Sequence, residues 1–243
     1  MEFKSVNKTL EKSFKNNWER EALSNYQGST LKYKEVAERI EYLHIAFSQC
    51  GLKRGEKVAL CSRNQANWAV CFLATMTYGA VPVPILHEFK AENIHYLVNH
   101  SEAKVLFVDE VIWDGLSESE MPDLEVIVQI NNLKFIYARN RFDEEIRGSL
   151  QKTFDKLYPE GFKPENIKYY EDKADELALI NYTSGTSGFS KGVMIPYRAL
   201  WCNINFARTV AEPQMTCESE IVAMLPSAHM YGMMFEFLFE MTI

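Results

Sequence analysis

Short apolar runs rich in β-branched residues alternate along this chain with longer stretches of helical periodicity. We expect strands at residues 58–61, 81–85, 105–108, 126–130, 177–182 and 221–225. Nearly continuous apolar strands are typical of a parallel sheet buried on both faces, because crossover helices cover each face. The pattern therefore predicts an α/β fold with a mostly parallel sheet and helices on both faces.

Three helices are predicted between these strands, at residues 33–49, 91–100 and 144–157, and a fourth begins near Tyr197. In the first helix the apolar residues recur at helical spacing, and Gly51 is placed to end it. Residues 113–123 are acidic and lack a clear pattern, which indicates a surface loop.

One stretch, residues 68–86, is uncharged over nineteen positions, close to the roughly 20 residues that span a bilayer. Gly79, Pro82 and Pro84 interrupt it where a helix would end and a strand would begin. The sequence therefore predicts a buried helix of about a dozen residues, a turn and a strand rather than a membrane span.

Composition excludes some functions for this chain of 243 residues. Its net charge of −7 argues against nucleic acid as the main partner, because phosphate backbones require clustered Lys and Arg. The five cysteines form no C-x-x-C pair, so neither a disulfide framework nor a zinc site is expected, and no metal ligands are predicted. The polar beginning of the chain is not a secretory signal, and we expect a reducing, cytoplasmic setting.

The most informative segment reads YTSGTSGFSKGV, at residues 182–193, directly after the apolar LALIN run. Its glycines allow backbone N–H groups to turn toward phosphate oxygens, its hydroxyls add donors, and Lys191 supplies a point charge. A solvated Ser/Gly linker would lack the apolar strand before it. We therefore predict an exposed phosphate-binding loop at residues 183–192.

Two well-known phosphate loops do not fit this segment. A Walker A loop has Gly before its lysine and Ser or Thr after it, whereas here Ser190 precedes Lys191 and Gly192 follows it. The dinucleotide pattern G-x-G-x-x-G is not matched either.

Residues 182–193 instead resemble the signature of the adenylate-forming (AMP-binding) superfamily, which includes acyl-CoA synthetases, luciferases and peptide-synthetase adenylation domains. That signature reads aromatic-Thr-Ser-Gly-Thr-Thr/Ser-Gly-x-Pro-Lys-Gly-Val, and the one departure is Ser190 in place of proline, which should loosen the loop. Residues 51–60, 78–84 and 101–108 extend the resemblance over nearly the whole chain.

A second motif, LPSAHMYG at residues 225–232, resembles the family segment that borders the acyl pocket. Its His229 follows a predicted strand end, where α/β enzymes place their ligands. The Leu-Pro-x-Ala-His form is similar to that of long-chain members and favours a fatty acid as substrate. The other histidines lack ligand spacing and are interpreted as structural or exposed: His44, His87, His95 and His100.

The resemblance implies two half-reactions, formation of an acyl-adenylate from ATP and a carboxylic acid, then transfer to coenzyme A, with Mg²⁺ screening the phosphates. It implies catalytic roles for Lys191 and His229, with His229 also binding the acyl substrate. The implied nucleotide-binding residues are Thr183, Ser184, Gly185, Thr186, Ser187, Gly188 and Lys191.

The resemblance also implies that residues 1–243 are the N-terminal part of an AMP-binding domain, because the family's later motifs do not occur here. Such a fragment is expected to be inactive alone. Its apolar end, around Phe235, Leu238 and Phe239, predicts a helix that is either exposed or buried against a neighbouring chain in a homo-oligomer. The alternative is a terminal helix docked in the core of its own chain, and peripheral membrane association is a further expectation.

Three functions remain open at this point. The first is a long-chain acyl-CoA synthetase acting on small molecules, namely a fatty acid, ATP and coenzyme A. The second is another adenylating enzyme, either an acyl-AMP ligase or an aryl-acid activator. The third is a non-catalytic nucleotide- or lipid-binding module.

Overall fold

The computed structural model describes residues 2–139, 144–183, 190–211, 214–215 and 218–243. At its centre is a five-stranded sheet in the order β4-β3-β5-β6-β7, in which only β7 is antiparallel to its neighbour. The strands are β3 (Lys57–Cys61), β4 (Val81–Ile85), β5 (Ala103–Val108), β6 (Val126–Gln129) and β7 (Lys134–Ala138). The mostly parallel sheet expected from the sequence is confirmed.

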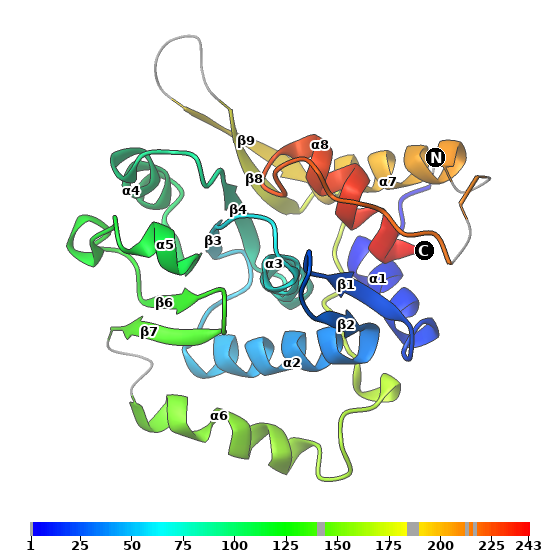
Figure 1. Ribbon diagram of the computed structural model, residues 1–243, viewed down its shortest axis with the longest axis horizontal. Coiled ribbons are helices and arrows are strands. Elements are labelled where there is room, and N and C mark those ends of the chain that lie inside the picture. Colours follow the sequence, from blue (N-terminus) through cyan, green and yellow to red (C-terminus); the bar gives the residue numbers. More distant parts are fainter. Residues whose placement is uncertain (1, 140–143, 184–189, 212–213, 216–217) are drawn as a thin grey trace.

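Helices cover both faces of this sheet, as the apolar strands predict (Figure 1). Val58 and Leu60 of β3 join one core cluster with α2 (Tyr33–Gln49) and α3 (Ala66–Tyr78), and α6 (Glu144–Leu157) lies outside α2. Ala59 and Cys61 point to the opposite face, where α4 (Ala91–His100) packs. This alternation along one strand is the physical basis of the two-sided fold.

Glycines stand at the ends of α2 and α3, where the sequence predicts them. Gly51 follows α2 with a φ of 73°, and Gly79 ends α3 with a φ of 89°. Left-handed φ values are inexpensive only for residues without a Cβ atom. Helix α3 is therefore a buried helix of 13 residues. No helix in the described ranges is both long enough and apolar enough to span a bilayer.

The remaining elements surround this core. They are α1 (Val6–Asn16), β1 (Glu21–Ser24), β2 (Thr30–Lys32), α5 (Glu110–Trp113), the 3₁₀ turns η1 (Glu118–Glu120) and η2 (Pro164–Asn166), α7 (Tyr197–Ala211), α8 (Met230–Met233), the π turn η4 (Met234–Leu238) and the 3₁₀ turn η5 (Glu240–Thr242). The acidic segment at residues 113–123 is mostly exposed, although Met121 within it is buried.

An antiparallel hairpin of β8 (Leu177–Thr183) and β9 (Lys191–Pro196) stands beside β4 and projects at the top of Figure 1. The prediction of a loop over residues 183–192 is therefore wrong at both ends, because Thr183 belongs to β8 and Lys191 and Gly192 belong to β9. The β9 run is short and begins with polar residues, so only its pairing with β8 identifies it as a strand.

The strand predicted at residues 221–225 is also absent. Val222 and Met224 are 77% and 81% exposed, and the backbone of the segment bonds to side chains instead of to a neighbouring strand. Asn64 donates to the carbonyl of Leu225, and Glu236 accepts from the Leu225 N–H. A β-branched composition alone does not make a strand without a partner edge.

The C-terminal segment is buried within the chain, so the prediction of an exposed helix there is wrong. Phe237 packs edge-on against Trp68 and Phe72 of α3, with ring centroids 5.8 and 5.7 Å apart. Leu238 and Phe239 are 0% and 2% exposed. Phe237, Leu238 and Phe239 are therefore packed within the chain.

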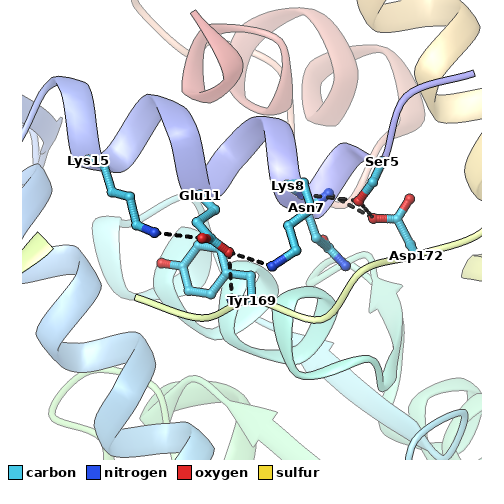
Figure 2. A network of polar contacts seen from close by, with 7 residues as sticks. All are labelled: Ser5, Asn7, Lys8, Glu11, Lys15, Tyr169 and Asp172. Atoms are coloured by element: carbon cyan, nitrogen blue, oxygen red, sulfur yellow. Dashed lines mark hydrogen bonds and ion pairs between the residues drawn. The ribbon is translucent and has the colours of Figure 1, made fainter. Parts of the chain in front are cut away.

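The start of α1 is held by the carboxylate of Asp172, which lies far along the chain (Figure 2). Asp172 accepts hydrogen bonds from the Ser5 hydroxyl at 2.6 Å and from the backbone N–H groups of Val6 and Asn7 at 3.1 and 2.8 Å. One turn later, Glu11 accepts from the Tyr169 N–H at 3.0 Å. These contacts fix the segment that leads into β8.

We expect Asp172→Asn to lower the free energy of unfolding by about 1–3 kcal/mol, because the amide presents its N–H₂ to buried donors that then lack an acceptor. Urea denaturation measures this change. Asp155→Asn is the matched control, since its exposed carboxylate bonds only to Gln151, and it should shift stability by less than about 0.5 kcal/mol. Equal effects for the two variants would contradict the capping role.

A second stability prediction concerns Glu240, whose carboxylate oxygens have no hydrogen-bond partner in the part of the chain that the structure describes. Burial, and secondarily the charge of Glu236, raises the pKa of Glu240 to about 7. The native state therefore holds a proton that the unfolded chain releases near pH 4.5. Stability from this group is present below that pH and is lost as pH rises through about 7.

Glu240→Gln should remove this dependence and make the protein more stable than wild type by about 2–3 kcal/mol at pH 8. Urea denaturation at pH 5, 6.5 and 8 tests it, with exposed Glu92→Gln as control. A wild-type stability that rises between pH 5 and 8, unchanged by Glu240→Gln, would refute the assignment.

Candidate functional site

The hairpin brings two of the predicted nucleotide-binding residues together at its open end. Thr183 is the last residue of β8 and Lys191 the first of β9, they are paired in the ladder, and both are exposed. The Thr183 hydroxyl and the Lys191 ammonium group thus lie at the two positions where the chain enters and leaves residues 184–189. The other predicted residues of this group, Ser184, Gly185, Thr186, Ser187 and Gly188, lie outside the described residues.

Close packing inside the hairpin explains two signature residues. A Cβ atom on Gly192 would lie 3.2 Å from atoms of the Tyr182 ring and 3.1 Å from Cγ2 of Ile180. The Tyr182 ring therefore covers the cross-strand glycine and packs the two strands together next to the Thr183–Lys191 pair.

The Tyr182 hydroxyl extends away from the hairpin to α4. It lies 2.7 Å from Nδ1 of His100, and burial raises the pKa of Tyr182 to about 12. The phenol is thus protonated at neutral pH and ties the hairpin to the sheet. On this side, a cavity of about 580 Å³ separates the hairpin from the amino-terminal ends of β3 and β4, with Arg54 and Lys57 in its wall.

His229 is not preceded by a strand but caps the short helix α8. Its Nδ1 accepts from the backbone N–H of Tyr231 at 3.3 Å, which places the proton of the neutral imidazole on Nε2. The side chain is exposed and so is accessible to a ligand.

A buried amide connects this histidine segment to the hairpin. Asn181 Nδ2 donates to the carbonyl oxygen of Ala228 at 3.1 Å. Asn181 stands two residues before Thr183 in β8, and Ala228 directly precedes His229. The structure therefore brings the two motifs, which are more than thirty residues apart in sequence, to one side of β8.

The same segment lies at the carboxyl edge of the parallel sheet. The chain leaves neighbouring strands β3 and β5 toward opposite faces of the sheet. After β3 it enters α3, which packs in one core cluster, and after β5 it enters α5, whose surroundings pack in the other. Neighbouring strands with such diverging connections form the crevice where α/β proteins bind ligands. Asn64, in the loop after β3, contacts residues 225–227 from this crevice.

Sequence reasoning missed Asn64 and Asn181. Asn181 was visible as a polar residue inside the apolar LALIN run, and Asn64 as a polar residue after a parallel strand. Neither position identifies its partner, because both contacts join distant parts of the chain.

Close approach also explains the last glycine of the LPSAHMYG motif. A Cβ atom on Gly232 would lie 3.0 Å from Cβ of Leu225 and 3.1 Å from the carbonyl oxygen of Pro226. Any larger residue at this position would therefore require Leu225 and Pro226 to shift by a few tenths of an ångström.

The described residues contain no group of three or more His, Cys, Asp or Glu side chains that could hold a metal ion. The cysteines in the described ranges are all unpaired, and burial raises the pKa of the Cys50 thiol to about 11 and that of Cys61 to about 12. These thiols are therefore unreactive packing residues.

Comparison with known proteins agrees with this fold and these motifs. A family model described as AMP-binding enzyme matches residues 10–242, and the chain belongs to this family. Long-chain-fatty-acid–CoA ligase 1 of Homo sapiens is 26% identical over 210 residues, covering 83% of this chain and 30% of that protein.

Two solved structures share the fold. ATP-bound MatB from Rhodopseudomonas palustris superposes with a TM-score of 0.74 at 20% identity, over 98% of this chain and 44% of that one. The anthranilate CoA ligase AuaEII, in complex with anthranoyl-AMP, gives a TM-score of 0.76 at 18% identity, over 100% and 43%. The chain thus spans about 30% of the human ligase and less than half of these two proteins.

Gly232→Ala should destabilise the protein by about 1–3 kcal/mol, because the added methyl group meets backbone that cannot move without displacing residues 225–226. Thermal or urea unfolding measures the loss. Gly148→Ala is the control, since nothing lies within 4 Å of that Cβ position in α6, and it should instead stabilise by roughly 0.5–1 kcal/mol. A neutral Gly232→Ala would refute the close approach.

Proposed function

We propose that the protein containing this chain activates a carboxylic acid with ATP and then transfers the acyl group to coenzyme A. The observation that carries this proposal is the connection of Thr183 and Lys191, through the Asn181–Ala228 hydrogen bond, to His229. The hairpin end proposed to bind phosphate and the segment proposed to bind the acid thus lie beside the same strand, β8, as a reaction between ATP and a carboxylate requires.

In the first step, an oxygen of the carboxylate attacks the α-phosphorus of ATP, and the bond to the bridging oxygen breaks. The products are an acyl-adenylate and pyrophosphate. Negative charge grows on the departing pyrophosphate, and the exposed ammonium of Lys191 is suited to stabilise it. In the second step, the sulfur of coenzyme A attacks the acyl carbon, the acyl–oxygen bond breaks and AMP leaves.

The roles of the individual residues are part of this proposal. The hydroxyl of Thr183 and the loop residues Ser184, Gly185, Thr186, Ser187 and Gly188 bind the outer phosphates with Lys191. His229 orients the acid, since its Nε2–H is the hydrogen-bond donor that a carboxylate accepts.

A long-chain fatty acid is the proposed substrate. The LPSAH motif and the similarity to the human long-chain-fatty-acid ligase both favour it. An aryl acid is the competing candidate, favoured by the fold shared with an anthranilate ligase. The two are distinguished by the acid that supports activity.

Two further features belong to this proposal. Mg²⁺ should accompany ATP by binding its phosphates, and we assign it no ligand among the described residues because they form no metal-binding cluster. A cytoplasmic location is proposed from the buried, unpaired Cys50, Cys61 and Cys71.

Lys191→Ala should leave stability within about 0.5 kcal/mol, because the side chain is exposed at the start of a strand. It should nevertheless reduce the acid-dependent exchange of labelled pyrophosphate into ATP by about 10- to 1000-fold. Removing a group that stabilises a developing negative charge lowers the rate by this order in other enzymes. The whole protein is assayed with a long-chain acid, acetate and benzoate.

Lys134→Ala is the matched control, because Lys134 is also an exposed first residue of an antiparallel strand. It should exchange at the wild-type rate. Unchanged exchange by a folded Lys191→Ala would remove this lysine from the mechanism, and no exchange with any acid would overturn the proposed function. Benzoate preferred over the long-chain acid would replace the fatty acid with an aryl acid.

A further inference from the structure

We infer that Asn64 and Asn181 are positioning residues that hold the backbone of residues 225–228 from two sides and thereby place His229. The inference rests on the proposed function for its catalytic consequence. Its structural part concerns only contacts within the described residues and is tested separately.

Asn64 contacts the segment with both ends of its amide. Its Nδ2 donates to the carbonyl oxygen of Leu225 at 2.7 Å, and its Oδ1 accepts from the backbone N–H of Ser227 at 2.7 Å. The Ser227 hydroxyl donates to the same Oδ1 at 2.9 Å. An amide that both donates and accepts fixes the direction of the backbone as well as its place.

Asn181 holds the next residue from the hairpin side. Its Nδ2 donates to the Ala228 carbonyl at 3.1 Å, and the side chain is 8% exposed. A polar group buried in a strand is costly unless it is hydrogen-bonded, so this contact belongs to the packed structure rather than to a mobile surface.

Apolar burial holds this part of the chain at Ala228, which is 5% exposed, but not in the residues before the motif. Ile221, Val222 and Met224, which lead into the motif, are 41%, 77% and 81% exposed. The segment has no strand partner in the described structure, and His229 itself is exposed. The polar bonds from Asn64, Asn181 and Glu236 are therefore the restraints that reach the backbone before His229.

The Asn64 bond is tested directly by amide hydrogen exchange on this chain. Asn64→Ala should speed exchange of the Ser227 amide by up to about tenfold, the equivalent of one hydrogen bond. Amides in β5 should be unaffected. Asn67→Ala is the matched control, because Asn67 lies three residues away and bonds to Arg39 and to the carbonyls of Ile130 and Asn131 instead.

The catalytic consequence is tested by pyrophosphate exchange with the whole protein. Asn64→Ala and Asn181→Leu, which keeps an apolar filling of similar size, should each raise the KM for the acid about tenfold. The KM for ATP should remain within twofold, and Asn67→Ala should leave both unchanged. Asn64→Ala combined with His229→Ala should be no worse than His229→Ala alone, because Asn64 acts through that histidine.

Each outcome decides the inference. An unchanged Ser227 amide overturns the Asn64 contact, and equal rises in both KM values, or additive losses in the double variant, overturn the positioning role. If the wild-type protein shows no exchange with any acid, the proposed function fails, while the amide measurement still decides whether Asn64 holds the segment. If Asn181→Leu does not fold, Asn181→Ser tests the same bond.

Discussion

The carboxylate of Asp172 joins the start of α1 to the segment that leads into the β8–β9 hairpin. It accepts from the first residues of α1, more than 160 positions earlier in the chain. Asn7 then extends the network to the Tyr197 hydroxyl and the Met76 carbonyl. Because the chain enters β8 after Asp172 and leaves β9 at Tyr197, both ends of the hairpin converge on α1.

Local patterns predicted most of the fold because their causes are local. The bounds of α2, α4 and α6 match the helical periodicity, and four strands of the central sheet follow β-branched runs. Failures occurred where a distant partner decides the outcome. Residues 221–225 resemble a strand in composition but have no strand edge to pair with in the described structure. Phe237 is buried because its ring packs against those of Trp68 and Phe72.

The residues of the candidate site also fall into two groups, those predicted from the sequence and those that only the fold brings into place. Lys191 stands in a glycine-bordered loop motif whose phosphate chemistry is predicted from the residues themselves, whereas His229 was predicted only from the family resemblance of its motif. Asn64 and Asn181 are ordinary polar residues until the fold places Leu225 and Ala228 against them. The net charge of the chain does not predict the charge at a single site. A chain of net charge −7 still has an exposed lysine, Lys191, at the end of the hairpin.

The bonds that hold the histidine segment end almost entirely on main-chain atoms. Asn64 contacts the Leu225 carbonyl and the Ser227 N–H, Asn181 contacts the Ala228 carbonyl, and Glu236 accepts the Leu225 N–H. Such restraints fix the backbone without specifying the side chains along it. The side chains of this segment can therefore vary while the same amides hold the backbone that leads to His229.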